Sequence, residues 1–338
     1  MTASFPIARP RRLRRTAALR ELVAETRLTV NDFVAPLFVR EGIDAPQPIV
    51  SLPGVMQHTV DSLLIEVREL AALGVKAVIL FGVPAVKDAT GSGAFDPDGI
   101  VQVALRALRA EFGDRIVLMA DLCVDEYTDH GHCGILDEHG DVDNDQTLQI
   151  YAKVALAQAE AGAHVVAPSG MMDGQVAAIR TALDSGGFND VSILAYSAKY
   201  ASGLYGPFRD AVDVQIVGGG DRKGYQQDWR SAREALVEVD ADIAQGADMV
   251  MVKPALSYLD IIVAVRQHTS LPVAAYHVSG EYAMIKAASA NGWIDHDTVA
   301  LEQLTAIKRA GADVILTYFT RWFAERSAAE LRAEAGVS

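Results

Sequence analysis

The sequence contains little cysteine and no long hydrophobic stretch. Only two cysteines, Cys123 and Cys133, occur in 338 residues, which excludes a disulfide framework and leaves both thiols free for metal or redox chemistry. No uninterrupted apolar run approaches the roughly 20 residues that a membrane helix needs, and the basic N-terminus lacks the apolar core of a signal peptide. We therefore expect a cytoplasmic protein without a membrane span.

Glycine loops that bind nucleotides are also missing. The one glycine-rich segment, residues 217–225 (VGGGDRKGY), follows no clear strand and fits neither the P-loop nor the Rossmann spacing. We interpret this segment as a mobile, lid-like loop of an active site. Half of all residues are apolar, which is enough for a large core and excludes disorder for the bulk of the chain.

Charge is unevenly distributed along the chain. The net charge is −14, yet the first 20 residues contain no acidic residue and six arginines: Arg9, Arg11, Arg12, Arg14, Arg15 and Arg20. An acidic body would repel nucleic-acid phosphates, and this segment lacks interleaved aromatics for stacking on bases. We expect no nucleic-acid partner, but an arm that embraces an acidic surface of a neighbouring subunit. A solvated tail is the alternative.

Eight apolar runs bounded by Gly, Pro or Asp are candidate strands. Their residues are 33–39, 77–83, 115–123, 164–169, 192–198, 249–254, 272–279 and 314–319. They are continuous rather than alternating, which is typical of parallel strands covered on both faces.

Helical patterns lie between these runs, for example at residues 60–74, 146–162, 231–246 and 301–311. Each of these four ends in a glycine, within the recurring joints LGVKAVIL, AGAHVVAP, QGADMVMV and AGADVILT. Glycine there predicts a left-handed helix cap followed by a short turn into the next strand.

Eight strands that alternate with helices predict a (β/α)8 barrel, with a doubly wound open sheet as the alternative. We expect an N-terminal arm over residues 1–30, making oligomer contacts, and a single catalytic barrel domain over residues 31–338.

Barrel enzymes place their chemistry at the C-terminal ends of the strands. The residues at those ends are Asp121, Cys123, Ser169, Lys199, Lys253, Ser279 and Tyr318. A single lysine at a strand end usually reaches water, but Lys199 and Lys253 come from adjacent strands and should meet in one pocket. Repulsion and desolvation would lower the pKa of at least one amine, which would then attack ketones as a nucleophile.

Five segments together resemble the porphobilinogen synthase (5-aminolevulinate dehydratase) family, in the family's order. They are DHGHCG (129–134), YSAKYASGLYGPFRDA (196–211), GADMVMVKPALSY (246–258), VSGEYAM (278–284) and KRAGADVILTYF (308–319). The resemblance covers most of the chain, including the arm. It implies condensation of two 5-aminolevulinate molecules to porphobilinogen with loss of two waters, in tetrapyrrole synthesis, without an organic cofactor.

The resemblance also implies roles for individual residues. Lys253 would form a Schiff base with one substrate molecule, and Lys199 would engage the other. Ser279 and Tyr318 would hold the first carboxylate. Ser169 is a further expected substrate-binding residue, and Asp121 is expected to be catalytic. The second carboxylate would meet Arg209, Arg222 and Gln226, since guanidinium groups suit a planar anion; the alternative for the arginines is surface ion pairing.

A metal site is expected in the segment DLCVDEYTDHGHC (121–133), where Cys123, Asp125 and Cys133 stand in place of the three cysteines of the zinc-dependent branch. Two thiolates and a carboxylate suit zinc and disfavour magnesium. The alternatives are a site that uses Asp121 and Asp125 without tightly held metal, and two buried structural cysteines. His130 and His132 receive no ligand role from the resemblance.

Three further expectations follow from the resemblance. Glu234 would belong to a separate magnesium site, or else to a solvated helix face. Gly170 stands where the family favours aspartate, so that the loop with Ser169 is held differently. The assembly would be a homo-octamer joined through the arms.

Two other functions remain open at this point. A different lysine-dependent barrel enzyme, such as an aldolase, would need one essential lysine and no cysteine pair. A nucleic-acid or scaffold protein would use the arm and form no imine. The joint presence of Lys199, Lys253 and the cysteine loop disfavours both.

Overall fold

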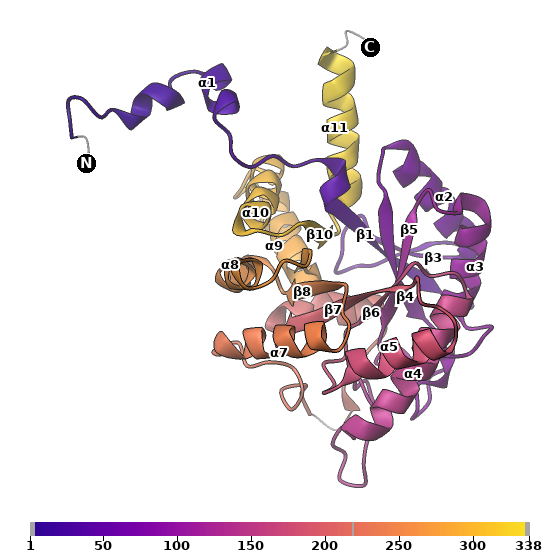
Figure 1. The fold of residues 1–338 in the computed structure, drawn as a ribbon. Helices are drawn as coiled ribbons and strands as arrows, with labels where there is room; N and C mark the ends of the chain where they lie inside the picture. The colour runs from indigo at the N-terminus through magenta and orange to yellow at the C-terminus, as the bar shows by residue number, and fades with distance from the viewer. Residues whose placement is uncertain (1–3, 218–219, 335–338) are drawn as a thin grey trace.

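Eight parallel strands form a closed barrel in the computed structural model, which describes residues 4–217 and 220–334 (Figure 1). The strands are β1 (Phe33–Arg40), β4 (Ala77–Val83), β5 (Val117–Leu122), β6 (Val165–Pro168), β7 (Ser192–Lys199), β8 (Met249–Lys253), β9 (Val273–His277) and β10 (Val314–Thr317). Each strand pairs with its predecessor in this order, and β10 pairs with β1. That last pairing confirms the predicted (β/α)8 barrel and shows that the open-sheet alternative was wrong.

Helices follow the strands and cover the outside of the barrel (Figure 1). They are α2 (Val60–Ala72), α3 (Ile100–Phe112), α4 (Asn144–Glu160), α5 (Gln175–Ser185), α6 (Gly206–Ala211), α7 (Arg233–Ala244), α8 (Leu259–His268), α9 (Ser279–Ala290), α10 (His296–Ala310) and α11 (Thr320–Glu334). The four helices predicted from the sequence are α2, α4, α7 and α10. Helix α10 begins five residues earlier than predicted because Asp295 caps it by accepting a hydrogen bond from the Thr298 amide.

Two short strands were not predicted. Strand β3 (Met56–His58) pairs in parallel with the end of β1, and β2 (Gln47–Pro48) pairs antiparallel with β3. Both lie in the connection between β1 and α2, at the end of the barrel where the strands finish.

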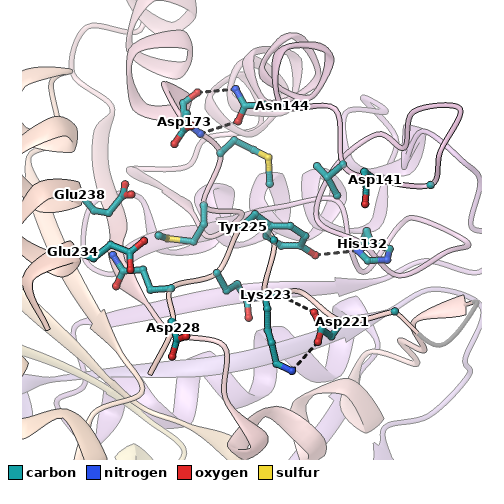
Figure 2. Close-up of a pocket in the computed structure, with 18 residues that line it drawn as sticks. His132, Asp141, Asn144, Asp173, Asp221, Lys223, Tyr225, Asp228, Glu234 and Glu238 are labelled. Atoms are coloured by element: carbon teal, nitrogen blue, oxygen red, sulfur yellow. Dashed lines mark hydrogen bonds and ion pairs between the residues drawn. The ribbon is translucent and has the colours of Figure 1, made fainter. Parts of the chain in front are cut away.

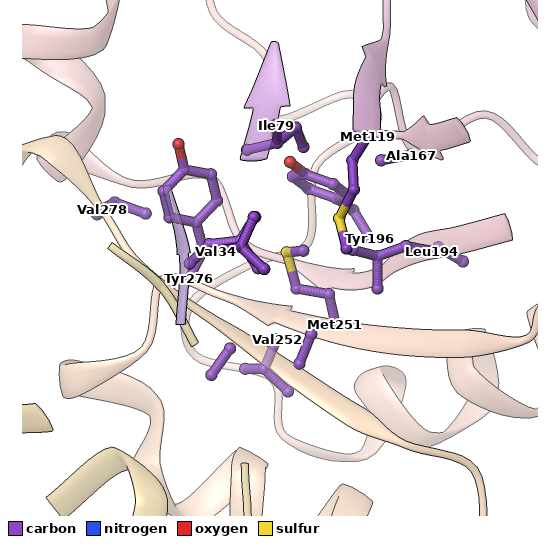
Figure 3. Close-up of a cluster of buried hydrophobic side chains, with 14 of the residues drawn as sticks. Val34, Ile79, Met119, Ala167, Leu194, Tyr196, Met251, Val252, Tyr276 and Val278 are labelled. Atoms are coloured by element: carbon purple, nitrogen blue, oxygen red, sulfur yellow. The ribbon is translucent and has the colours of Figure 1, made fainter. Parts of the chain in front are cut away.

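The alternation of side chains divides the core into two layers. In β1, Val34 and Phe38 belong to the cluster that includes the barrel interior, whereas Ala35 and Leu37 pack outward in the cluster of α2 and α3 side chains. Figure 3 shows part of the interior cluster, with Met251 among residues from several strands. Because both faces of each strand are buried, the strands appear in the sequence as continuous apolar runs.

The repeated glycine joints fix the opposite end of the barrel. All four glycines have a left-handed backbone, as predicted: φ is +92° at Gly74, +103° at Gly162, +103° at Gly246 and +118° at Gly311. Asp248 follows Gly246 by two residues and accepts a hydrogen bond from a backbone amide of the preceding strand at 2.7 Å. Asp313 follows Gly311 by two residues and accepts a corresponding hydrogen bond at 2.9 Å. These joints are therefore structural, and they lie away from the strand ends that carry the lysines.

The N-terminal segment extends away from the barrel (Figure 1). It contains a 3-10 helix (Pro10–Arg14) and the short helix α1 (Ala17–Leu22), neither of which has a buried residue. Among the residues that the structure describes, no helix combines the length and the hydropathy required to cross a membrane.

Candidate active site

Lys199 and Lys253 end two neighbouring strands in matched register. Their Cα atoms pair across β7 and β8, and both side chains are buried and line one cavity at the C-terminal end of the barrel. The Lys199 Nζ atom donates a hydrogen bond to the carbonyl of Ser169. The structure thus brings together the two amines that the sequence analysis placed in one pocket.

Aromatic rings surround the Lys253 amine. Its Nζ atom lies 4.6 Å from the ring centroid of Tyr276, 5.0 Å from that of Tyr196, and 5.4 Å from those of Tyr205 and Phe208. Burial, together with the charge of Lys199, lowers the pKa of Lys253 to about 7 against the opposing effect of Asp121. A free amine is therefore available at neutral pH. The ring faces would also stabilise a cation formed at this nitrogen.

Asp121 and Ser169 lie beside the lysines. The Ser169 hydroxyl donates to the Asp121 carboxylate at 3.0 Å, and both residues line the lysine cavity. Burial raises the pKa of Asp121 to about 6, although the charges of Lys253 and Lys199 oppose this shift. Asp121 is thus suited to exchange protons near neutral pH.

Two arginines close the lysine cavity on its outer side. Arg209 on α6 and Arg222 line both this cavity and a second pocket outside it, to which Gln226 and Lys223 also belong. Arg222 is buried, forms a 2.8 Å ion pair with Asp125 and donates to the carbonyl of Gly131 at 2.8 Å. The Nε atoms of both arginines have no hydrogen-bond partner among the described residues.

Three expected substrate-binding residues lie at the border of this cavity or outside it. The Ser279 hydroxyl accepts a hydrogen bond from the Phe208 amide at 3.0 Å and so anchors the helix that carries Arg209. The Tyr318 hydroxyl lies 3.2 Å from that of Tyr276, behind the rings around Lys253. Gln226 is buried in the outer pocket, and its Nε2 atom lacks a hydrogen-bond partner within the described chain.

Cys123, Asp125 and Cys133 meet beside the same cavity. One ligand atom from each lies within 4.8 Å of the others, and all three residues are buried. Burial raises the pKa of Cys123. For Cys133, burial acts in the same direction, but the Cys123 thiol and the Arg222 charge outweigh it and lower the pKa. Two thiols and a carboxylate this close fit a soft divalent ion, since Zn–S bonds are about 2.3 Å long.

The glycine-rich segment packs on the cysteine loop at both of its described ends. The Val217 amide donates to the carbonyl of His130 at 3.2 Å, and the Tyr225 hydroxyl accepts from the Cys133 amide at 3.3 Å. Residues 218 and 219 of the expected lid lie outside the described residues. His132 lies 3.3 Å from the same Tyr225 hydroxyl and is not among the clustered metal-ligand atoms.

Glu234 lies away from the lysines, in an acidic pocket (Figure 2). This pocket is lined by the first turns of α7, the glycine-rich segment and the loops after β5 and β6. Its carboxylates belong to Asp141, Asp173, Asp221, Asp228, Glu234 and Glu238. Burial and the neighbouring acidic groups raise the pKa of Glu238 to about 7. A cation would relieve this repulsion.

Several residues around the lysines were not among the candidates from the sequence. Tyr196, Tyr205, Phe208 and Tyr276 look like ordinary core aromatics in a sequence, and only the fold gathers them around Lys253. Glu126 also lines the cavity. Both of its carboxylate oxygens are buried without a hydrogen-bond partner in the described part of the chain. An unpaired buried carboxylate is rare, but a single acidic residue next to Asp125 gives no signal in one sequence.

Comparisons with known proteins agree on one family. The family model described as delta-aminolevulinic acid dehydratase matches residues 7–326. The delta-aminolevulinic acid dehydratase of Streptomyces coelicolor is 60% identical over 318 residues, which cover 94% of this chain and 96% of that one. That of Mycobacterium tuberculosis is 58% identical over 319 residues, with the same coverage.

A solved structure shares the whole fold. The Toxoplasma gondii delta-aminolevulinic acid dehydratase (porphobilinogen synthase), in complex with its reaction product porphobilinogen, superposes with a TM-score of 0.92 at 46% sequence identity. The match covers 94% of this chain and 91% of that one.

Proposed function

The chain belongs to the delta-aminolevulinic acid dehydratase family and is an enzyme that makes porphobilinogen from 5-aminolevulinate, and we propose that Lys253 and Lys199 carry this reaction as its two substrate-binding amines. The supporting observation is the register match that buries both amines in one cavity. An ordinary aldolase needs only one such amine. The second lysine therefore favours a reaction that joins two carbonyl substrates.

Lys253 would act first as the nucleophile. Its free amine adds to the substrate ketone, and loss of one water gives an imine. Protonation makes this imine more electrophilic and its α-protons more acidic. The rings around Nζ exclude water from the imine and stabilise its positive charge. Holding both substrate molecules side by side removes an entropic barrier worth up to about 7 to 11 kcal/mol.

Asp121 and Ser169 would move protons in this cavity. Asp121 holds the Ser169 hydroxyl at 3.0 Å, and its pKa of about 6 lets it both accept and return a proton near pH 7. Glu126 would receive the ammonium group of a substrate molecule, because its oxygens face the cavity without a hydrogen-bond partner in the described chain. Glu126→Gln should then raise KM more than it lowers kcat.

One of the two substrate carboxylates would bind on the outer side of the lysines. Arg209, Arg222 and Gln226 are proposed to hold this carboxylate, which would supply the partners that their nitrogen atoms lack. Ser279 and Tyr318 are proposed for the other. Their hydroxyls are already bonded to Phe208 and Tyr276, so each would have to exchange or share that contact on binding.

We propose zinc as the metal at Cys123, Asp125 and Cys133. When bound, zinc would act as a Lewis acid beside the second substrate molecule. The protein's own contribution is a buried anionic donor set next to Lys199, with Arg222 balancing the charge of Asp125. Magnesium is proposed for the separate acidic pocket of Glu234, where all charged ligands are carboxylates.

The N-terminal segment is proposed to join subunits, up to an octamer. It exposes apolar side chains next to its arginines: Phe5 is 74% exposed, Ile7 75% and Leu22 75%. A neighbouring acidic body would cover both kinds of side chain. Residues 1–30 would thus form an oligomer arm and residues 31–338 the catalytic domain, in a cytoplasmic enzyme.

The deciding experiment measures porphobilinogen formation from 5-aminolevulinate by chelator-stripped protein, with zinc or magnesium added back separately. No product under any condition would refute the assignment. Rescue by zinc alone would support the thiolate site. Full activity after chelation, or rescue by magnesium alone, would contradict it and transfer the metal requirement to the Glu234 pocket.

A further inference from the structure

Gly170 and Tyr151 meet directly behind the cysteine loop. Gly170 follows Ser169 at the end of β6, and Tyr151 projects from α4 with none of its surface exposed. A Cβ atom built on Gly170 would lie 1.6 Å from the Tyr151 hydroxyl oxygen and 2.6 Å from its Cζ atom. The tyrosine therefore fills the space that any side chain at position 170 would need.

The hydroxyl of Tyr151 touches both cysteines of the proposed metal site. It donates to the carbonyl of Cys133 at 2.6 Å and lies 3.6 Å from the Sγ atom of Cys123. A tyrosine hydroxyl has a single proton. Because this proton is used in the hydrogen bond to the Cys133 carbonyl, the Tyr151 hydroxyl oxygen can only accept from Cys123. It accepts a hydrogen bond from the Cys123 thiol while this thiol is protonated. One atom thus fixes two residues that are ten positions apart in an irregular loop.

Cys133 is held on both sides of its Cα atom. Its amide donates to the Tyr225 hydroxyl at 3.3 Å, and its carbonyl accepts from Tyr151. Removing the Tyr151 hydroxyl would leave a buried carbonyl without a donor and a gap beside Cys123. The thiolates would then lose the fixed separation that a small ion requires.

We propose that Tyr151 is a positioning residue for the Cys123, Asp125 and Cys133 site, and that Gly170 is required because it leaves room for the tyrosine. This inference rests on the proposed metal site, and it adds a residue that holds the metal ligands in place without binding the metal itself. It also gives a physical reason for the glycine where the family resemblance suggested aspartate. A side chain at position 170 and a tyrosine at position 151 exclude each other.

The test is a zinc titration of metal-free, full-length protein against a chromophoric chelator. Tyr151→Phe should raise the zinc dissociation constant about tenfold or more, the usual effect of losing an outer partner of a ligand. Tyr282→Phe is the matched control, because Tyr282 also donates to a backbone carbonyl, that of Pro53, at 2.6 Å. Its zinc affinity should stay within about twofold of wild type.

A second measurement separates ligand placement from general damage. Cobalt-loaded wild-type protein should show thiolate-to-metal charge-transfer absorption, which Tyr151→Phe should weaken or shift. The metal-free Tyr151→Phe and Tyr282→Phe proteins should lose similar thermal stability, because each loses one hydrogen bond to a backbone carbonyl. Gly170→Ala should reduce zinc affinity in the wild-type background. In the Tyr151→Leu background it should have no further effect, since Leu lacks the atoms with which the new Cβ collides.

These outcomes separate a failure of the positioning role from a failure of the metal site. Zinc affinity of Tyr151→Phe equal to wild type, or independent additive effects of the substitutions at positions 151 and 170, would overturn the positioning role alone. A wild-type protein that binds no zinc through its thiols would overturn the metal site and this inference together, while leaving porphobilinogen formation by the lysines intact.

Discussion

Lys253 should lose its proton near neutral pH, and Lys199 should be part of the cause. The pKa of Lys253 is about 7, so that roughly 90% of it is free amine at pH 8, against roughly 0.4% for a lysine with an ordinary pKa of about 10.4. The protein thereby supplies about 200-fold more nucleophile at this pH. Below pH 7 the amine becomes protonated, so imine formation should decline as the pH falls.

Lys199→Met tests the contribution of the second amine. As a general scale, two unit charges ~8 Å apart in an effective dielectric constant of about 20 interact by about 2 kcal/mol, or about 1.5 pKa units. The substitution should therefore raise the pKa of Lys253 from about 7 to roughly 8 to 9. It should not restore the ordinary value, because burial is the largest cause of the shift.

The assay is borohydride trapping of the imine with 5-aminolevulinate, with the initial rate at Lys253 followed by peptide mass spectrometry as a function of pH. Asp121→Asn should shift the midpoint downward, since that carboxylate raises the pKa of Lys253. Lys253→Met should leave this position unlabelled. A wild-type midpoint above about pH 9, or a midpoint that stays or falls in Lys199→Met, would refute the reasoning.

Three further predictions concern parts of the fold that support the site. Gly246→Ala should destabilise the protein by about 1 kcal/mol or more in urea unfolding, because φ is +103° at this position and alanine disfavours this left-handed conformation. Gly206→Ala is the control and should change stability much less, since the space around its Cβ position is open. Glu281→Gln should lower the melting temperature and kcat, because this buried carboxylate accepts amide hydrogen bonds from Leu256 at 2.6 Å and Val278 at 2.7 Å; retention of both values would contradict that role. Deletion of residues 1–29 should reduce the assembly size in sedimentation while leaving a folded barrel, and an unchanged size would exclude the arm as the main contact.

The barrel could be predicted from the sequence because its physical requirements are local. Each strand is covered on both faces. The side chains of β4 that face the barrel interior are therefore as apolar as those that face the helices, and the whole strand appears in the sequence as one apolar run. The left-handed glycines after four of the helices mark where β4, β6, β8 and β10 begin. The predicted start and end of every barrel strand therefore lie within two residues of the observed ones.

The site could be predicted only in part, because its closest contacts join residues that are far apart in the chain. Strand-end positions were enough to bring Lys199, Lys253 and Asp121 together. The hydroxyl of Tyr151 reaches Cys133 from a helix that otherwise has an ordinary amphipathic pattern. The ion pair between Arg222 and Asp125 joins two loops that are 97 positions apart in sequence, and no spacing rule connects them.

The position of Lys199 itself depends on an irregularity that the sequence does not reveal. Leu194 and Tyr196 belong to the interior cluster of Figure 3, so strict alternation along β7 would direct residue 199 outward. The pairing of β7 with β8 shifts register between Ala195 and Ala198. After this shift Lys199 pairs with Lys253 and lines the same cavity, 5.8 Å from the ring centroid of Tyr196. Since bulges reorient side chains near active sites, the two-amine site arises from a local departure from the regular strand geometry that builds the rest of the barrel.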